Sequence, residues 1–117
     1  MTVEKVRKYC IKKRGVTEGF PFNDTTLVFK VMGKMFCLVG LTPPQTVNLK
    51  CDPEFAVELR EKYDGITPGY HMNKTYWNTV DLTTNIREEE ILKWIDLSYK
   101  LVADSLPKKV KAEFEKL

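Results

Sequence analysis

The amino-acid sequence predicts an α+β fold with two layers, an antiparallel sheet and helices packed on one of its faces. The predicted elements follow the order helix, three strands, helix, two strands, helix, with a short C-terminal helix, and include no strand-helix-strand repeat of the kind that builds parallel sheets. The length of 117 residues suits a single domain, residues 1–117, with one core. The composition, 43% hydrophobic and 30% charged, is that of a globular protein.

The first predicted helix lies at the N-terminus. Thr2 is a suitable N-cap, and Gly15 can adopt the left-handed conformation that ends helices. Between them the apolar residues recur on one side, at Val3, Val6 and Cys10. The following segment, VTEGFPFND at residues 16–24, is predicted to be a loop.

Three strands are predicted next. Residues 25–31 and 35–41 are rich in β-branched and aromatic residues and flank a turn at residues 32–34, which predicts a hairpin. Two prolines then interrupt the ladder. Residues 46–51 alternate between apolar and polar side chains, as expected of a third strand.

The second helix has clear boundaries. The pair Asp52-Pro53 is a preferred helix start, and Asp64-Gly65 ends the helix. The sequence Thr-Pro-Gly at residues 67–69 predicts a turn or a sheet edge, and residues 70–72 and 76–82 are predicted to be extended.

A long helix follows, for which Asn85 is the predicted N-cap. The three glutamates at residues 88–90 suit its first turn because acidic groups interact favourably with the positive end of the helix dipole. Its wide apolar face is formed by Ile91, Trp94, Ile95, Ser98, Tyr99 and Val102. Ser105 and Pro107 then start a short helix with Val110, Phe114 and Leu117 on one side.

We expect a cytoplasmic protein. The longest apolar stretch, residues 35–41, is far shorter than the roughly 20 residues that a membrane helix needs, and the N-terminus has no apolar signal core. Cys10, Cys37 and Cys51 are widely spaced and form no CxxC pair, so buried thiols are expected.

Charge is distributed unevenly along the chain, although the net charge is only +3. Residues 1–14 carry six basic groups and one acidic group, and residues 25–51 carry three lysines and no acidic residue. A net charge of this size does not by itself indicate a nucleic-acid-binding protein. A solvated helix face is the favoured explanation of the N-terminal cluster.

The sequence does not indicate an enzyme. His71 is the only histidine, no acidic residue lies within six positions of it, and no G-x-S-x-G serine is present. A phosphate-binding loop and a cluster of metal ligands are also lacking. We therefore expect a binding protein without a cofactor or a metal.

Residues 69–80, GYHMNKTYWNTV, alternate aromatic rings with hydrogen-bonding groups. Lysines that contact phosphates and rings that stack on bases suit nucleic acid, and the same groups suit a peptide. The candidate nucleic-acid-binding residues are Lys30, Lys34, Lys50, His71, Lys74, Tyr76 and Trp77. For Trp77 and Tyr70 the alternative is structural, with the rings filling the seam between sheet and helices, and for Trp77 we favour this alternative.

Several stretches resemble the MmcQ/YjbR family of small bacterial proteins. They follow one another in order from about Thr2 to Leu106: TVEKVRKYC, GFPFND, LVFKVMGKMFCLV, NLKCDPEFAVELREKY, ITPGYHMNKTYWNTVDL and SYKLV. The family pattern falls on Pro21, Phe22, Gly33, Lys34, Phe36, Asn48, Leu49, Lys50, Pro68, Gly69, Tyr70, His71, Met72, Asn73, Lys74 and Trp77. Many members have a histidine immediately before the tryptophan, where this chain has Tyr76.

The resemblance implies a secretion-chaperone-like fold, which agrees with the order of elements above. It also implies DNA binding, proposed for members because their curved sheet resembles a double-wing surface. Two hypotheses follow: a nucleic-acid-binding module that uses the open face of the sheet, or a protein-interaction module in which that face or a strand edge receives a peptide or a second copy of the chain.

Overall fold

The computed structural model describes residues 1–69 and 72–117. Its elements, in chain order, are α1 (Val3–Ile11), β1 (Val16–Gly19), β2 (Thr26–Val31), β3 (Lys34–Gly40), β4 (Thr46–Lys50), α2 (Pro53–Lys62), β5 (Ile66–Pro68), β6 (Trp77–Asp81), α3 (Glu88–Asp104) and α4 (Lys108–Glu115).

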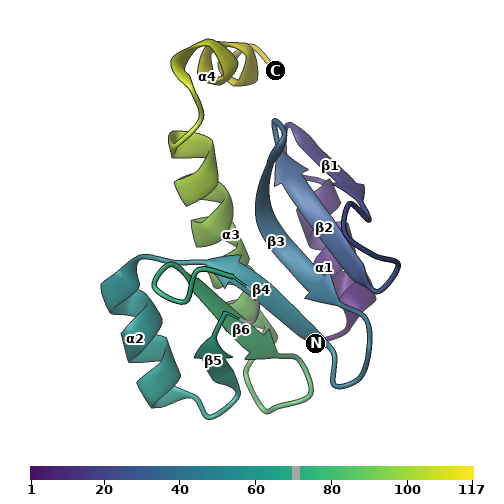
Figure 1. Ribbon diagram of the computed structural model, residues 1–117, viewed down its shortest axis with the longest axis vertical. Coiled ribbons are helices and arrows are strands. Elements are labelled where there is room, and N and C mark those ends of the chain that lie inside the picture. The colour runs from purple at the N-terminus through teal and green to yellow at the C-terminus, as the bar shows by residue number, and fades with distance from the viewer. Residues whose placement is uncertain (70–71) are drawn as a thin grey trace.

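The described strands form one sheet in the order β1-β2-β3-β4-β6-β5, and every neighbouring pair is antiparallel. Helices α1 and α3 lie behind the sheet in the view of Figure 1, and α2 lies beside β5 and β6. The side of the sheet that faces the viewer carries no helix in the described part of the chain. The predicted two-layer α+β fold is therefore confirmed.

The main correction concerns β1, because residues 16–19 were predicted to belong to a loop. Strand β1 pairs antiparallel with β2, with Val16 opposite Val31 and Gly19 opposite Val28. It lies at the edge of the sheet, where a short segment pairs on one side only. The sequence VTEG has no apolar alternation to reveal this, so pairing with β2 decides its conformation.

Several predicted boundaries also differ in the structure. The predicted sheet edge after α2 is strand β5, which ends at Pro68. Tyr70 and His71 of the predicted extended segment 70–72 lie outside the described residues, and Met72 lies in a bend. The N-cap of α3 is Arg87 and makes no side-chain cap bond, so the predicted cap at Asn85 is wrong. The predicted strand at residues 76–82 is confirmed as β6.

The main core lies between the sheet and the helices. The predicted apolar face of α3 is confirmed, since Ile91, Trp94, Ile95, Ser98 and Val102 are buried. Helix α2 packs against α3 through Tyr63, whose ring centroid is 5.5 Å from that of Trp94. The three cysteines are free and buried, as predicted. None of the helices in the described part of the chain has the length and apolar character needed to span a membrane.

A β-bulge divides strand β3. Cys37 is opposite Phe29 and Met35 is opposite Lys30, so Phe36 is an extra residue in the ladder. Phe36 and Cys37 consequently both belong to the main core. Before the bulge the alternation of side chains is reversed, and Lys34 lies opposite Val31, a core residue.

Strands β3 and β4 pair only from Cys37 to Gly40 and diverge beyond that point (Figure 1). Ser98 of α3 connects the two strands where they separate. Its hydroxyl group accepts a hydrogen bond from the Lys50 backbone N–H at 2.9 Å and donates one to the Phe36 carbonyl at 2.5 Å. Ser98 is fully buried, so no water can replace these bonds.

Replacement of Ser98 with alanine is expected to lower the free energy of unfolding by about 1–3 kcal/mol, because it leaves two backbone groups without a partner in a buried site. Ser105→Ala is the matched control. The Ser105 hydroxyl group donates only to the Val102 carbonyl of the same helix and is exposed, so an effect below about 0.5 kcal/mol is expected. Urea denaturation measures both, and equal effects would contradict the bridging role of Ser98.

Candidate functional site

The uncovered side of the sheet, here called the open face, consists of alternate residues of each strand. The register places these side chains on the side opposite the main core: Thr17, Thr26, Val28, Lys30, Met35, Leu38, Thr46, Asn48, Lys50, Thr67, Trp77, Thr79 and Asp81. Val28, Leu38 and Trp77 form a small second apolar cluster on this face. The remaining residues are mainly hydroxyl-bearing, amide or basic.

A groove with a volume of about 860 Å³ crosses the open face. Its floor is formed by β2, β3, β4 and β6, and its rims by the loops before β2, between β3 and β4, and after β5. The lining residues are Phe22, Asn23, Thr25, Thr26, Leu38, Gly40, Thr42, Pro44, Thr46, Asn48, Thr67, Met72 and Thr79. None of these described residues carries a charge at neutral pH, so the groove is electrically neutral and rich in hydrogen-bonding groups.

Hydrogen bonds fix several of the lining side chains. The Thr79 hydroxyl group donates to the side-chain oxygen of Asn48, which directs the Asn48 amide. On the rim, the side-chain oxygen of Asn23 accepts from the Thr25 backbone N–H at 3.0 Å and from the Thr25 hydroxyl group at 3.2 Å. Gly40 leaves room in the floor, since a Cβ atom there would lie 2.8 Å from the Thr46 hydroxyl oxygen. These contacts give the groove a preformed shape.

Trp77 is buried, with 8% of its surface exposed, but it does not fill the seam between sheet and helices. Its ring packs on the open face with Val28 and Leu38, and Met35 and Met72 partly cover this cluster. From the sequence, a buried Trp77 in the seam between sheet and helices was favoured. The burial is confirmed, but the ring lies on the open face. The neighbouring Tyr76 is 45% exposed.

Only two of the four predicted lysine contacts lie together on the open face. Lys30 and Lys50 are half-buried there, on β2 and β4, with β3 between them. Lys34 lies on the helix side, where its amine donates to the Ser105 carbonyl at 3.5 Å. Lys74 donates to the Gly69 carbonyl at 3.2 Å, and its own carbonyl accepts from Arg60 of α2 at 3.0 Å. His71 lies outside the described residues.

The residues that line the rims were not predicted as site residues. Phe22 and Met72 were part of the family pattern, whereas Asn23, Thr25 and Thr42 were not singled out. One signal was available in the sequence, because polar residues at alternate positions of the predicted strand 46–51 belong to one face. The loop contributions depend on the tertiary fold and have no comparable local pattern.

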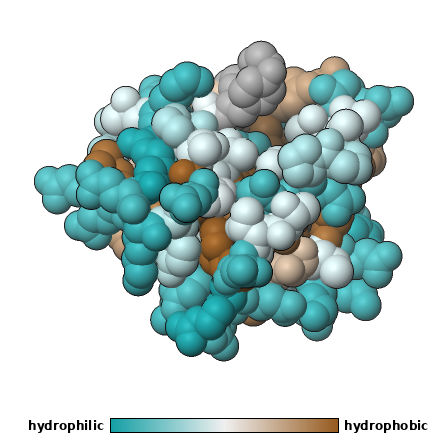
Figure 2. Space-filling view, turned by 90° about the horizontal axis from the view of Figure 1, so that it is seen from below, coloured by the Kyte–Doolittle hydropathy of each residue, from teal (hydrophilic) through white to brown (hydrophobic). Residues whose placement is uncertain are grey.

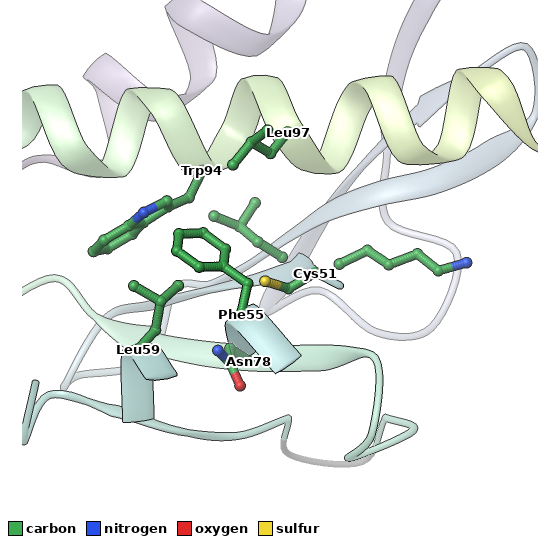
Figure 3. A pocket seen from close by; sticks show the side chains of 8 residues that line it. Cys51, Phe55, Leu59, Asn78, Trp94 and Leu97 are labelled. Carbon is green, nitrogen blue, oxygen red and sulfur yellow. The ribbon is translucent and has the colours of Figure 1, made fainter. Parts of the chain in front are cut away.

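A second, small pocket lies between α2 and α3 (Figure 3). Phe55 and Leu59 of α2 and Trp94 and Leu97 of α3 line it, with Cys51 beside them. Its volume of about 10 Å³ holds about one water molecule. Burial, together with the charge of Asp52, raises the pKa of Cys51 to about 11, so the thiol is protonated at neutral pH. This pocket is therefore packing space in the core.

The end of the molecule opposite α4 offers no continuous apolar surface among the residues described there. Figure 2 shows that hydrophobic residues at this end occupy separate small areas between hydrophilic ones. The open-face groove is thus the principal candidate site.

These features define a class of protein, a small α+β domain with one helical layer and an uncovered sheet face that carries a neutral groove. Within this class, the chain belongs to the YjbR family, whose sequence profile matches residues 11–101. This confirms the resemblance inferred from the sequence motifs.

Relatives with similar sequences occur in Escherichia coli. The protein YjbR of strain K12 is 30% identical over 108 residues, which cover 92% of this chain and 92% of the relative. YbdF of strain O157:H7 is 38% identical over 107 residues, covering 91% and 88%. Both are described as uncharacterised, so they establish the family and carry no ligand over to this chain.

Solved structures of similar proteins agree with the fold. The crystal structure of a Deinococcus radiodurans protein superposes with a TM-score of 0.91 at 37% identity and covers 97% of this chain and 88% of that one. A crystal structure from Pseudomonas syringae has a TM-score of 0.77 at 29% identity, with 87% and 99% covered.

Gly69→Ala is expected to disturb the open face near Trp77. An added Cβ atom would lie 2.7 Å from the Trp77 Cβ atom and 3.0 Å from its carbonyl oxygen. We expect a loss of about 1–3 kcal/mol in the free energy of unfolding from this overpacking. A red shift of the Trp77 fluorescence, measured with Trp94→Phe as background, is expected as well.

Gly19→Ala is the control for this substitution. A Cβ atom at Gly19 would meet no described atom within 4 Å. If both glycine variants left stability and fluorescence unchanged, the close packing of Gly69 on Trp77 would be disproved.

Proposed function

We propose that this protein is a binding protein, not an enzyme, and that its groove takes an uncharged, extended segment of a partner polypeptide. The observation that carries the proposal is the neutrality of the groove, which combines hydroxyl and amide side chains with apolar ones. A phosphate or a carboxylate would enter it without a cationic partner. A peptide backbone, in contrast, offers N–H and C=O groups for the threonine and asparagine side chains.

Strand addition at an edge of the sheet is the less favourable way to bind a peptide here. Edge strand β5 has three residues and ends in Pro68, which lacks a backbone donor. The other edge strand, β1, has four residues and ends in Gly19. Such short edges offer few ladder bonds, whereas the groove offers a much longer contact surface.

Phe22 is a suitable anchor for the partner. It lies on the rim of the groove and is 62% exposed. Large aromatic residues often contribute most of the binding energy at protein interfaces. Phe20 lies two residues earlier and is 52% exposed, but it does not line the groove, so it is a matched control.

The proposal is tested with peptides selected by phage display against the immobilised protein. Phe22→Ala is expected to lower the affinity for the selected peptides by about tenfold or more, which corresponds to at least about 1.4 kcal/mol of binding free energy. Phe20→Ala is expected to change the affinity less than twofold. Fluorescence polarisation measures both, and amide shifts at Thr26, Thr46 and Thr67 in NMR spectra locate the peptide.

Selected peptides that bind both phenylalanine variants equally and leave those three amides unshifted would refute binding in the groove. Introduction of a charge provides an independent check. Thr67 is exposed on β5, so the fold is expected to tolerate Thr67→Arg. The added charge is expected to lower the affinity of the groove for uncharged peptides.

DNA binding through the open face is the second candidate function. It is supported by Lys30 and Lys50, which share this face. Two lysines provide at most two phosphate contacts. These contacts should therefore contribute about −2 to the slope of the logarithm of duplex affinity against the logarithm of salt concentration.

In this case the double variant Lys30→Gln and Lys50→Gln is expected to make the salt slope shallower by about 1.8, since each phosphate contact contributes about 0.9. Fluorescence anisotropy with a labelled duplex between about 50 and 200 mM salt measures the slope. A salt slope that the double variant leaves unchanged would contradict DNA binding at this face.

A further inference from the structure

Several cations, all exposed except the half-buried Lys111, lie at the end of the molecule formed by α4. Figure 1 places α4 and the C-terminus above the tip of the β2–β3 hairpin. We define the basic end as six residues from the α1–β1 turn, the start of β3, and α4 with its C-cap: Arg14, Lys34, Lys108, Lys109, Lys111 and Lys116. Four of these residues are sequence neighbours in or just after α4, and the fold brings Arg14 and Lys34 to them.

Several contacts hold the three segments in place. The guanidinium group of Arg14 lies 4.9 Å from the ring centroid of Phe114 and donates to the Leu117 carbonyl at 3.2 Å. The Phe114 ring in turn packs on Tyr99 of α3, with 6.3 Å between the centroids. Lys34 reaches the Ser105 carbonyl in the turn between α3 and α4. The basic end is therefore an ordered part of the fold.

The positive charge at this end is only partly neutralised, by the charge of Asp104 near Lys111. None of the six cations forms an ion pair with a described acidic residue. Asp104 is already paired with Lys100 at 2.9 Å, which lowers the pKa of its carboxyl group. Two glutamates of α4, Glu113 and Glu115, oppose the six cations. Basic residues therefore outnumber acidic ones at this end.

Helix stability does not explain the lysines that begin α4. A helix is favoured by acidic residues in its first turn, and α3 follows this rule with Glu88, Glu89 and Glu90. Helix α4 has no acidic residue in its first turn and begins with Lys108 and Lys109. The lysines at the start of α4 are therefore unfavourable for helix stability, which suggests that they serve a role other than stabilising the helix.

We propose that the basic end binds the phosphate backbone of nucleic acid without sequence preference. A surface with several unpaired lysines and an arginine complements a regularly spaced polyanion. A lipid membrane fits less well, because membrane-surface helices need an exposed apolar side. In α4 the apolar residues Val110 and Phe114 are half-buried, and Phe114 packs on Tyr99 of α3. This inference is independent of what occupies the groove.

The experiment compares triple variants of the intact chain in binding to a labelled 20-base-pair duplex of arbitrary sequence. Lys108, Lys109 and Lys111 are changed to glutamine in the first variant. The control carries the same changes at Lys8, Lys62 and Lys93, which lie on α1, α2 and α3 and alter the net charge equally. Circular dichroism verifies that both variants are folded.

For the basic-end variant we expect an affinity at least tenfold lower near 0.1 M salt and a log-log salt slope smaller by about 2.7, since each phosphate contact contributes about 0.9. The control is expected to bind within about twofold of the unmodified protein.

Equal losses in the two triple variants would overturn the inference, as would the absence of duplex binding at micromolar protein. A loss caused only by the Lys30→Gln and Lys50→Gln pair would overturn it in favour of the open face. Lysine-dependent binding to phosphatidylserine vesicles without duplex binding would overturn it in favour of a membrane surface.

Discussion

The structure depends on the way in which α3 supports a sheet whose two halves separate. Beyond Cys37 and Leu49, strands β3 and β4 no longer pair, and a buried backbone group without a partner there is costly. Ser98 of α3 binds one group from each strand and so keeps this helix against the sheet. Because α3 and α1 occupy the same side, the other side remains uncovered in the described part of the chain. The groove is a consequence of this one-sided arrangement.

The bulge at Phe36 determines which lysines belong to the open face. With regular alternation from Cys37, Lys34 would lie on the open face, as the sequence prediction assumed. The extra residue reverses the alternation before it, which places Lys34 opposite Val31 and near Ser105. Because of this one extra residue, Lys34 belongs to the basic end and not to the open face. Lys30 and Lys50 remain on the open face.

Elements with a strong local signal were predictable from the sequence. The repeat of apolar residues specified the buried side of α3, and the pair Asp52-Pro53 specified the start of α2, where the Asp52 carboxylate accepts the Phe55 N–H. Strand β1 was not predictable because pairing with β2 creates it. The face occupied by Trp77 was also ambiguous, because both sides of β6 carry apolar residues. Val80 belongs to the main core on the helix side, whereas Trp77 belongs to the small cluster on the open face. The groove combines loops that are distant in sequence, so no local pattern could reveal it.

The groove and the basic end are far enough apart to act separately. Met32, at the hairpin tip, lies six positions after Thr26, at the groove, and these six steps along the strand span about 20 Å at roughly 3.3 Å per residue. At physiological ionic strength the Debye length is about 8 Å, so the field of the exposed lysines is largely screened over this distance. The neutral lining therefore determines what enters the groove, whereas the cations act on ligands that approach α4. An anionic ligand at one end and an uncharged segment in the groove are consequently compatible on a single chain of this size.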